Sequence, residues 1–314
     1  MASMQIFDAA ATRAALPFER LVPALEALFA QGCEVPARHV HEVAVPGGTA
    51  FTSLIMPAWI PGRYYGIKTI NIAPGNAQLG LPGLHASYLL CDGGTGVPLA
   101  VIDGDVLTHH RTAAASALAA RWLARADARH LLVVGAGQIA RLLPQAYRAV
   151  RDIAEVSVWA RDTAKAEALA GQLRQEGVPA RAVADLQAAC GAADIVSCAT
   201  LATAPLVRGE WLAPGSHLDL IGSFTPAMRE ADVRCFEGAR TFIDTGEALQ
   251  KSGDLLDAMA ADTLRADAVQ GTLAELCRGE RRGRTGSGER TVFKAVGSAL
   301  EDLTAATLVW QDAA

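Results

Sequence analysis

The chain has 314 residues, of which 51% are hydrophobic and 19% charged, and its formal net charge at neutral pH is -5. These values predict a globular protein with a substantial core, arranged as one large or two ordinary domains. The acidic balance, without a stripe of lysine and arginine interleaved with aromatic residues, argues against nucleic-acid binding. No stretch approaches about 18 uninterrupted apolar residues, so we expect no membrane span.

The cysteine pattern and the N-terminal residues bear on compartment. The six cysteines are scattered, with no C-x-x-C pair and no metal-ligand spacing. Charged residues interrupt the first 33 positions and leave no signal-peptide core. We therefore expect a cytoplasmic protein with reduced thiols and no metal site.

The first third of the chain predicts a mixed substrate domain. Residues 17–31 carry leucines at helical spacing, and residues 35–107 form short extended runs broken by glycine and proline. Such runs predict antiparallel strands and hairpins, with one of the turns at Asp103–Asp105. The alanine-rich segment from Thr112 on predicts a helix that joins two domains.

Residues 130–140, HLLVVGAGQIA, match the G-x-G-x-x-A form of the dinucleotide fingerprint. Four apolar residues lead into Gly135, Gly137 and Ala140. This pattern predicts a buried strand, a tight turn and a helix start whose free N–H groups and dipole attract a pyrophosphate. The residues predicted to bind the cofactor here are Gly135, Gly137, Gln138 and Ile139.

From residue 129 to about 280, short apolar runs alternate with helical segments. This alternation predicts a doubly wound parallel Rossmann sheet covered on both faces, beside a second α+β domain with an antiparallel sheet. In such a fold the strand ends present ligands, which points to Thr200 and Leu201 after the fourth core strand as further cofactor-binding residues and to Ser223 after the fifth.

The last part of the chain predicts a return to the first domain. Residues 278–290 are basic, rich in glycine and poor in apolar side chains, as is typical of a mobile surface loop. Apolar residues at helical spacing from Val296 on predict a final helix that packs on the first domain. The predicted division is residues 1–118 plus 291–314 for substrate binding and dimerisation, and 119–290 for the dinucleotide.

Two positions bear on the choice of cofactor. In dinucleotide folds an acidic residue at the end of the second strand binds the adenine ribose, whereas an arginine there pairs with a 2'-phosphate. Here Ala160 ends the strand and Arg161 follows, with Asp162 next. We therefore favour NADP(H) and keep NAD(H) open, since a one-residue shift of the strand end would favour NAD.

Several motifs resemble the ornithine cyclodeaminase and mu-crystallin family over nearly the whole chain. They are IMPAW at 55–59, GIKT at 66–69, TGVPLAVIDGDVLTHHRTAAASALAA at 95–120, VVGAG at 133–137, GEWLAPGSH at 209–217 and TVFKAVGSALED at 291–302. The resemblance implies a two-domain oxidoreductase, a homodimer formed through the antiparallel domain, and a cleft that binds a small amino or imino acid beside the nicotinamide.

The resemblance carries over at three basic positions. Arg38 and Arg111 match residues that hold the substrate carboxylate in the family, and Lys68 matches the lysine at the reacting carbon–nitrogen group. The chemistry agrees, because an arginine fork suits a carboxylate and a lysine can serve as a point charge or proton donor.

One departure from the family pattern separates its activities. Members that cyclise ornithine or deaminate alanine carry an aspartate two residues after a glycine, where this chain has Phe224. Phenylalanine cannot take a proton. Glu230 or Asp232 could substitute, or could be charges at a helix start. Mu-crystallin-like ketimine reductases and pyrroline-2-carboxylate reductases also lack the aspartate, and this chain resembles them in its GSFTPAMRE run.

The sequence thus predicts an NAD(P)H-dependent reduction of a cyclic imino acid, pyrroline-2-carboxylate or piperideine-2-carboxylate, to proline or pipecolate. Lys68 is the predicted catalytic residue, and Arg38, Arg111, Ser223 and Phe224 are the predicted substrate contacts. Three alternatives stay open: an ornithine cyclodeaminase, an amino-acid oxidoreductase like alanine dehydrogenase, and a non-enzymatic NADPH-binding protein like mu-crystallin.

Overall fold

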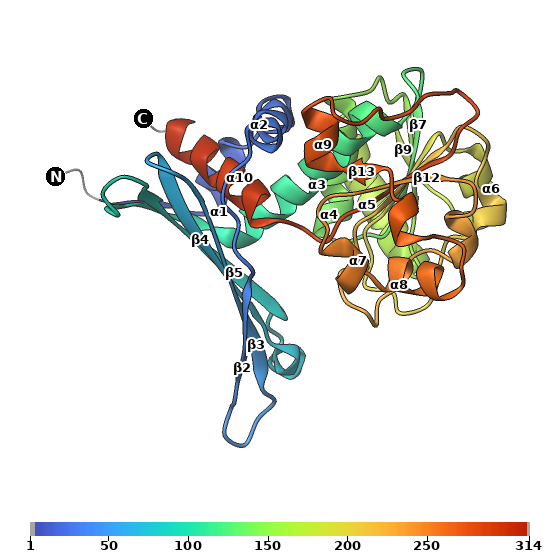
Figure 1. The fold of residues 1–314 in the computed structure, drawn as a ribbon. Helices are drawn as coiled ribbons and strands as arrows, with labels where there is room; N and C mark the ends of the chain where they lie inside the picture. The colour runs from blue at the N-terminus through green and yellow to red at the C-terminus, as the bar shows by residue number, and fades with distance from the viewer. Residues whose placement is uncertain (1–3, 313–314) are drawn as a thin grey trace. The chain divides into compact units, whose positions relative to one another are not determined.

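The computed structural model describes residues 4–312, which divide into two compact units (Figure 1). The first unit runs to Arg111 and resumes at Ser298, and the second comprises Thr112–Gly297. Both junctions differ from the division predicted from the sequence. One reason is that a single helix, α3 (Gly104–Leu123), runs across the first junction without a break.

The first unit is built on a six-stranded sheet of order β1-β6-β5-β4-β3-β2. Neighbouring strands are antiparallel except β1 and β6, which are parallel. The sheet is therefore mixed, and the short N-terminal strand β1 escaped the sequence prediction. The strands are β1 (Gln5–Phe7), β2 (His39–Val43), β3 (Phe51–Ile60), β4 (Tyr64–Ile72), β5 (Leu84–Asp92) and β6 (Pro98–Asp103). The helices are α1 (Ala9–Ala14), α2 (Phe18–Gln31), the short 3-10 helix η1 (Pro74–Leu79) and α10 (Ala299–Asp312).

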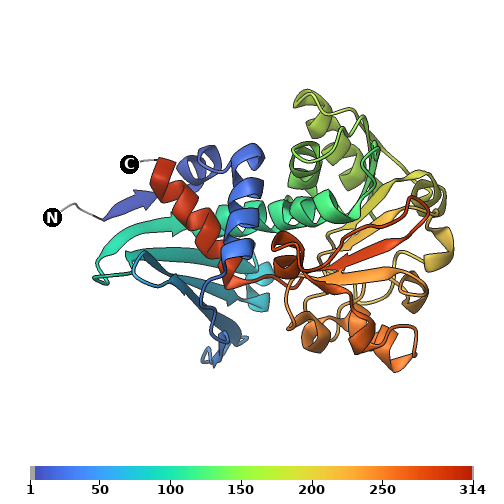
Figure 2. The same ribbon diagram turned by 45° about the horizontal axis from the view of Figure 1, so that its top comes forward.

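The last helix, α10, covers one face of this sheet. It packs against α2 and over β3, β4 and β5 (Figure 2). Met56, Lys68 and Tyr88 are partners in register across these three strands, so their side chains share one face. All three are buried. A lysine therefore lies in the apolar layer under α10.

The turn predicted at Asp103–Asp105 is wrong. Strand β6 ends at Asp103, and α3 begins at the next residue. The Asp103 carboxylate accepts a hydrogen bond from the Val106 N–H at 2.8 Å, which satisfies a free donor of the first helical turn. The aspartates that resembled a turn are thus a helix start, and Arg111 lies on a helix.

The second unit contains an eight-stranded parallel sheet of order β13-β12-β14-β11-β10-β7-β8-β9. Between β7 and β10 the direction of winding reverses, which is where doubly wound folds bind ligands. Its strands are β7 (His130–Val134), β8 (Glu155–Trp159), β9 (Ala180–Ala182), β10 (Ile195–Cys198), β11 (His217–Leu220), β12 (Arg240–Ile243), β13 (Gly271–Thr272) and β14 (Thr291–Lys294). Besides α3, its helices are α4 (Gln138–Arg148), α5 (Thr163–Gln175), α6 (Leu186–Ala192), α7 (Ala248–Lys251), α8 (Gly253–Ala260) and α9 (Leu273–Cys277), with 3-10 turns η2 (Gly209–Trp211), η3 (Val233–Cys235) and η4 (Ala266–Ala268).

Two expectations about the end of this unit need correction. Thr291–Lys294, assigned by sequence to the first domain, is a fully buried strand between β11 and β12. The preceding loop, 278–290, is held in place and not free. The Arg284 guanidinium donates to the carbonyl of Leu123, the last residue of α3, at 2.7 Å and to that of Ser216 at 3.1 Å.

A buried carboxylate ties the layers of the second unit together. Asp219 on β11 is fully buried and accepts hydrogen bonds from Ser116 on α3 at 3.2 Å, Tyr147 on α4 at 2.9 Å and Ser197 on β10 at 2.5 Å. Burial raises the pKa of Asp219 to about 6, against the effect of these hydroxyl donors. One side chain thus joins two helices to two strands.

We expect Tyr147→Phe to lower the free energy of unfolding by about 1–2 kcal/mol, because it removes one of the two hydroxyl donors to the buried Asp219 Oδ2. Tyr88→Phe is the matched control: the Tyr88 hydroxyl is buried without a hydrogen-bond partner among the described residues. Its removal should leave stability unchanged or raise it by about 1 kcal/mol. Urea denaturation of both variants makes the measurement, and equal losses would contradict the assignment.

Candidate functional site

The fingerprint glycine Gly135 lies where the backbone of two strands comes close. It follows β7 with a φ of +129°, and a Cβ atom placed on it would lie 2.5 Å from the carbonyl oxygen of Ala199, which follows β10. Only glycine fits this conformation and this contact. The turn at the winding reversal therefore depends on Gly135.

Gly137 and Gln138 form an open helix start. Both are exposed, and Gly137 is the N-cap of α4, so no side chain of that residue covers the first N–H groups. A Cβ placed on Gly137 would meet no atom within 4 Å. Open space beside free N–H groups at a helix start suits a pyrophosphate. Gly135, Gly137, Gln138 and the half-buried Ile139 thus fit the predicted dinucleotide cradle.

At the end of β8, Arg161 and Asp162 have different surroundings. Both are exposed, but the Asp162 carboxylate caps α5 by accepting a hydrogen bond from the Ala164 N–H at 3.0 Å. Strand β8 ends at Trp159. Arg161 is therefore the exposed charge that follows the strand, and Asp162 already serves the helix.

The ends of β10 and β11 carry the other predicted residues. Leu201 and Phe224 are 76% and 41% exposed, a large value for apolar side chains. Ser223, in contrast, is fully buried, and its hydroxyl donates to the Met228 carbonyl at 2.6 Å and accepts from the Asp254 N–H at 3.1 Å. The loop itself thus uses the Ser223 hydroxyl, while Leu201 and Phe224 present open apolar surface.

In the first unit, the predicted cations Lys68 and Arg111 share a partner. Lys68 on β4 and Arg111 on α3 both bind the Asp302 carboxylate on α10, at 2.6 Å and 2.9 Å. Arg111 also binds Glu301 at 2.6 Å. Lys68 and Asp302 are fully buried, whereas 8% of the Arg111 side chain is exposed. Two positively and two negatively charged groups thus meet among these four side chains.

Some polar atoms in and beside this cluster are available to bind a ligand. Arg111 engages its neighbours through Nε and Nη1, and no hydrogen bond from its Nη2 to another described residue is present. The Asp302 Oδ2 and the Tyr88 hydroxyl are also buried without a partner in the described part of the chain. Buried polar groups normally have partners. A small polar ligand would supply them.

Burial lowers the pKa of Lys68 to about 8, a change that the Asp302 carboxylate opposes and the Arg111 charge assists. Lys68 therefore gains or loses a proton close to neutral pH, as a proton donor should. The same carboxylates raise the pKa of Arg111, so that it stays charged.

Arg38 directly precedes β2, whose first residue, His39, pairs with Ile55. Continuing that register puts Arg38 beside Met56, itself the partner of Lys68. Two strand spacings, about 10 Å, separate the Arg38 and Lys68 backbones, a span that long side chains can bridge. Its role in binding a carboxylate stays a prediction.

The sequence did not single out Glu301, Asp302 or Tyr88. The two carboxylates end the motif TVFKAVGSALED, but nothing in their spacing along the chain places them against Lys68. A buried lysine needs a buried anion, so the unusual apolar setting of Lys68 on its strand was the usable indication.

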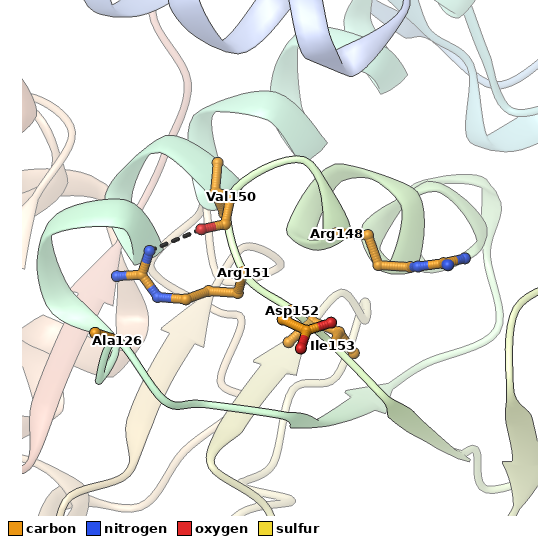
Figure 3. Close-up of a pocket in the computed structure, with 6 residues that line it drawn as sticks. All are labelled: Ala126, Arg148, Val150, Arg151, Asp152 and Ile153. Atoms are coloured by element: carbon orange, nitrogen blue, oxygen red, sulfur yellow. Dashed lines mark hydrogen bonds between the residues drawn. The ribbon is translucent and has the colours of Figure 1, made fainter.

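A pocket of about 540 Å³ lies elsewhere on the second unit (Figure 3). It is lined by Ala126, Arg148, Val150, Arg151, Asp152 and Ile153. These residues precede β8, at the edge opposite the strand ends that carry the fingerprint. The Arg151 guanidinium there donates to the carbonyls of Ala120, Arg121, Ala124 and Arg125 and so closes the end of α3. This pocket is structural and separate from the dinucleotide cradle.

Two kinds of site are absent from residues 4–312. No cluster of three or more His, Cys, Asp or Glu side chains could hold a metal ion. None of the helices in this range has the length and apolar character needed to cross a bilayer.

A family model described as the ornithine cyclodeaminase/mu-crystallin family matches residues 12–314. The chain belongs to this family. The resemblance seen in the sequence is thereby confirmed.

Several relatives are similar over nearly the whole chain. A Delta(1)-pyrroline-2-carboxylate reductase of Paracoccus denitrificans is 42% identical over 288 residues, 91% of this chain and 90% of the relative. The structure of the Thermococcus litoralis Delta(1)-pyrroline-2-carboxylate reductase in complex with NADH and L-proline is 30% identical, with a TM-score of 0.91, covering 99% of this chain and 97% of that one. An archaeal alanine dehydrogenase dimer with bound NAD is 28% identical, with a TM-score of 0.90, covering 99% and 96%.

We expect kcat/KM for an imine substrate to be constant below a pH of about 8 and to fall above it, because Lys68 then loses its proton. Asp302→Asn removes the largest influence that keeps Lys68 protonated, so the fall should begin at lower pH. Ionisation of the free substrate is common to both enzymes, so the difference between their pH profiles reports on the groups that Asp302 contacts, of which Lys68 is the one that titrates near pH 8. Identical profiles would contradict this coupling.

Proposed function

We propose that this protein reduces a cyclic 2-imino acid, pyrroline-2-carboxylate or piperideine-2-carboxylate, to the cyclic amino acid with NADPH. The chain is an NAD(P)-dependent oxidoreductase of its family, as the relatives and the dinucleotide fold together indicate. The choice of ring and of NADPH over NADH is our proposal.

The observation that carries the proposal is the pairing of Lys68 and Arg111 on one carboxylate in a buried layer. A protonated cyclic imine with a 2-carboxylate has one positive and one negative charge. Arg111 offers its Nη2 to the substrate carboxylate, and the Asp302 Oδ2 offers an acceptor to the iminium N–H. A zwitterion adds no net charge to the cluster that receives it, which avoids bringing an uncompensated charge into a buried site.

Chemically, little more than positioning is required. A bound nicotinamide supplies the hydride that reduces C2, and the substrate becomes a secondary amine. The chain holds the ring, keeps the imine nitrogen protonated through Lys68 and excludes water. No side chain has to manage ammonia, which is consistent with Phe224 at the position of the family's aspartate.

The structure of the second unit also argues against a substitute for that aspartate. Glu230 is fully buried and accepts hydrogen bonds from the backbone of Thr200 and Gly222. Asp232 accepts from the Gly209 N–H at 2.9 Å. Both carboxylates are used in holding loops, so neither replaces the missing base. The alternative of ornithine cyclodeamination is accordingly the less favoured reaction.

The test compares two readouts on purified protein. With pyrroline-2-carboxylate or piperideine-2-carboxylate we expect stoichiometric oxidation of NADPH, and with ornithine no ammonia. Ammonia from ornithine without net NADPH oxidation would instead establish a cyclodeaminase, and NADH formation from alanine an alanine dehydrogenase. Tight NADPH binding with no oxidation by any imine would indicate a binding protein.

Lys68→Ala is the control for this assay. It should abolish turnover and spare NADPH binding, measured by fluorescence titration, because Lys68 lies in the first unit and the dinucleotide cradle in the second. Unchanged turnover would remove Lys68 from the mechanism.

We expect Arg161→Ser to raise the KM for NADPH by about tenfold and to leave the KM for NADH nearly unchanged. The loss corresponds to one charge-assisted contact to the 2'-phosphate. Arg181→Ser, a change at another exposed arginine on the same sheet, is the matched control. If both cofactors respond equally to Arg161→Ser, the arginine does not read the phosphate.

Assembly as a homodimer through the sheet of the first unit stays a prediction of the family resemblance. Strand β2 forms one edge of that sheet and is exposed along its whole length, which leaves room for a partner.

A further inference from the structure

A single buried carboxylate joins the two loops that follow β10 and β11. The Glu230 Oε1 accepts hydrogen bonds from the Thr200 N–H at 2.7 Å and from its hydroxyl at 2.8 Å. The Oε2 accepts from the Gly222 N–H at 2.6 Å. Glu230 is fully buried, so water does not compete for these contacts. Each loop therefore depends on the same side chain for its position.

The two loops also touch directly. A Cβ placed on Gly222 would lie 1.9 Å from the Thr200 carbonyl oxygen and 2.5 Å from the Glu230 Oε1. Only glycine allows the backbones to come this close. The Glu230 carboxylate thus holds together two loops whose backbones leave no room for a side chain at Gly222.

Glu230 itself is held from behind. The Asp254 Oδ1 accepts hydrogen bonds from the N–H groups of Glu230 at 2.8 Å and Ala231 at 3.1 Å. Lys294 on β14 lies 3.8 Å from the Asp254 Oδ2 and donates to the Leu220 carbonyl at 3.0 Å. Burial raises the pKa of Glu230 to about 7; Lys294 opposes this and Asp254 adds to it. Asp254 on α8 and Lys294 on β14 thus support Glu230, and Glu230 in turn holds the two loops.

What the loops present is apolar and open. Leu201 directly follows Thr200, and Phe224 lies two residues after Gly222; both are exposed. Leu201 follows β10, which borders the winding reversal, and Phe224 follows the next strand, β11. Because β7, β10 and β11 are parallel, both residues lie at the end of the sheet that carries the fingerprint cradle. Their positions are set by the backbone of Thr200 and Gly222.

We propose that Glu230 is a positioning residue, which fixes the spacing of these two loops so that Leu201 and Phe224 contact the nicotinamide end of the bound dinucleotide. This inference rests on the proposed use of a nicotinamide cofactor, but not on the identity of the imino acid. Glu230 acts through the loops and touches neither substrate nor cofactor.

The test is Glu230→Gln, whose amide keeps the size of the side chain and places an N–H group against one of the donors. We expect the Kd for NADPH, measured by fluorescence titration, to rise by about tenfold and kcat to fall. The KM for the imino acid should change less than the Kd for NADPH, because Arg111, the proposed contact for its carboxylate, lies in the first unit. Since the titration uses no substrate, it reports on the loops even if the enzyme reduces a different substrate.

Asp219→Asn is the matched control, since Asp219 on β11 is an equally buried carboxylate that accepts three hydrogen bonds. We expect it to lower thermal stability and to leave the Kd for NADPH within about twofold of the parent. Equal changes in Kd for the two variants, or an unchanged Kd in Glu230→Gln, would overturn the proposal.

Should Glu230→Gln fail to fold, Thr200 supplies the test. Thr200→Val removes one donor to the carboxylate, and Thr200→Ser keeps it. A Kd raised about threefold in the valine variant and restored in the serine variant supports the proposal. Equal values in both variants reject it.

Discussion

The first unit depends on the ion pair between Lys68 and Asp302. A lysine in an apolar layer is unfavourable unless a carboxylate meets it, because a buried charge without a partner costs several kcal/mol. Here the partner comes from a helix 234 residues further along the chain. The requirement fixes where α10 must lie on the sheet, and with it Glu301 and the contacts of Arg111. The same ion pair therefore packs α10 on the sheet and brings the residues of the site together.

The same pair explains how one lysine can be both buried and useful. Desolvation lowers the pKa of Lys68, and the Asp302 carboxylate opposes that change. The balance leaves the proton available near neutral pH. The second unit uses the opposite solution: its buried carboxylates, Asp219 and Glu230, are surrounded by hydroxyl and N–H donors and serve to hold backbone in place. Lys68 is thus paired with a charged group, whereas Asp219 and Glu230 bind neutral donors.

Much of the second unit could be predicted from the sequence, because a parallel sheet buried on both faces leaves continuous apolar runs and a dinucleotide turn leaves its glycines. Strand β14 was not predicted, because TVFK is a segment of only four residues with no periodicity of its own, and a helical pattern follows it closely. The start of α3 escaped for a different reason: Asp103 is equally suited to a turn and to a helix cap, and only the tertiary structure decides between them.

The candidate site divides in the same way. Lys68 and Arg111 could be identified from motifs, and the structure brings them together. Asp302 and Glu301 could not, since their importance arises from a contact between distant segments. Ser223 illustrates the converse, because its position at a strand end says nothing about which atoms occupy its hydroxyl. Residue type and position on a strand indicate which side chains are candidates for the site. Burial and hydrogen bonding then decide which of their atoms are available to a ligand.

The order of the segments along the chain has a consequence for synthesis on the ribosome. The second unit is continuous, so all strands of its sheet are available before α10 has been made. The first unit is discontinuous, so Lys68 on β4 cannot bind Asp302 until α10 has been made. Domains generally fold as units during synthesis, N-terminal parts first. In this chain, by contrast, the N-terminal unit is the one that can be completed last, because it needs α10. Until α10 has been made, the apolar face of its sheet carries Lys68 without the Asp302 carboxylate.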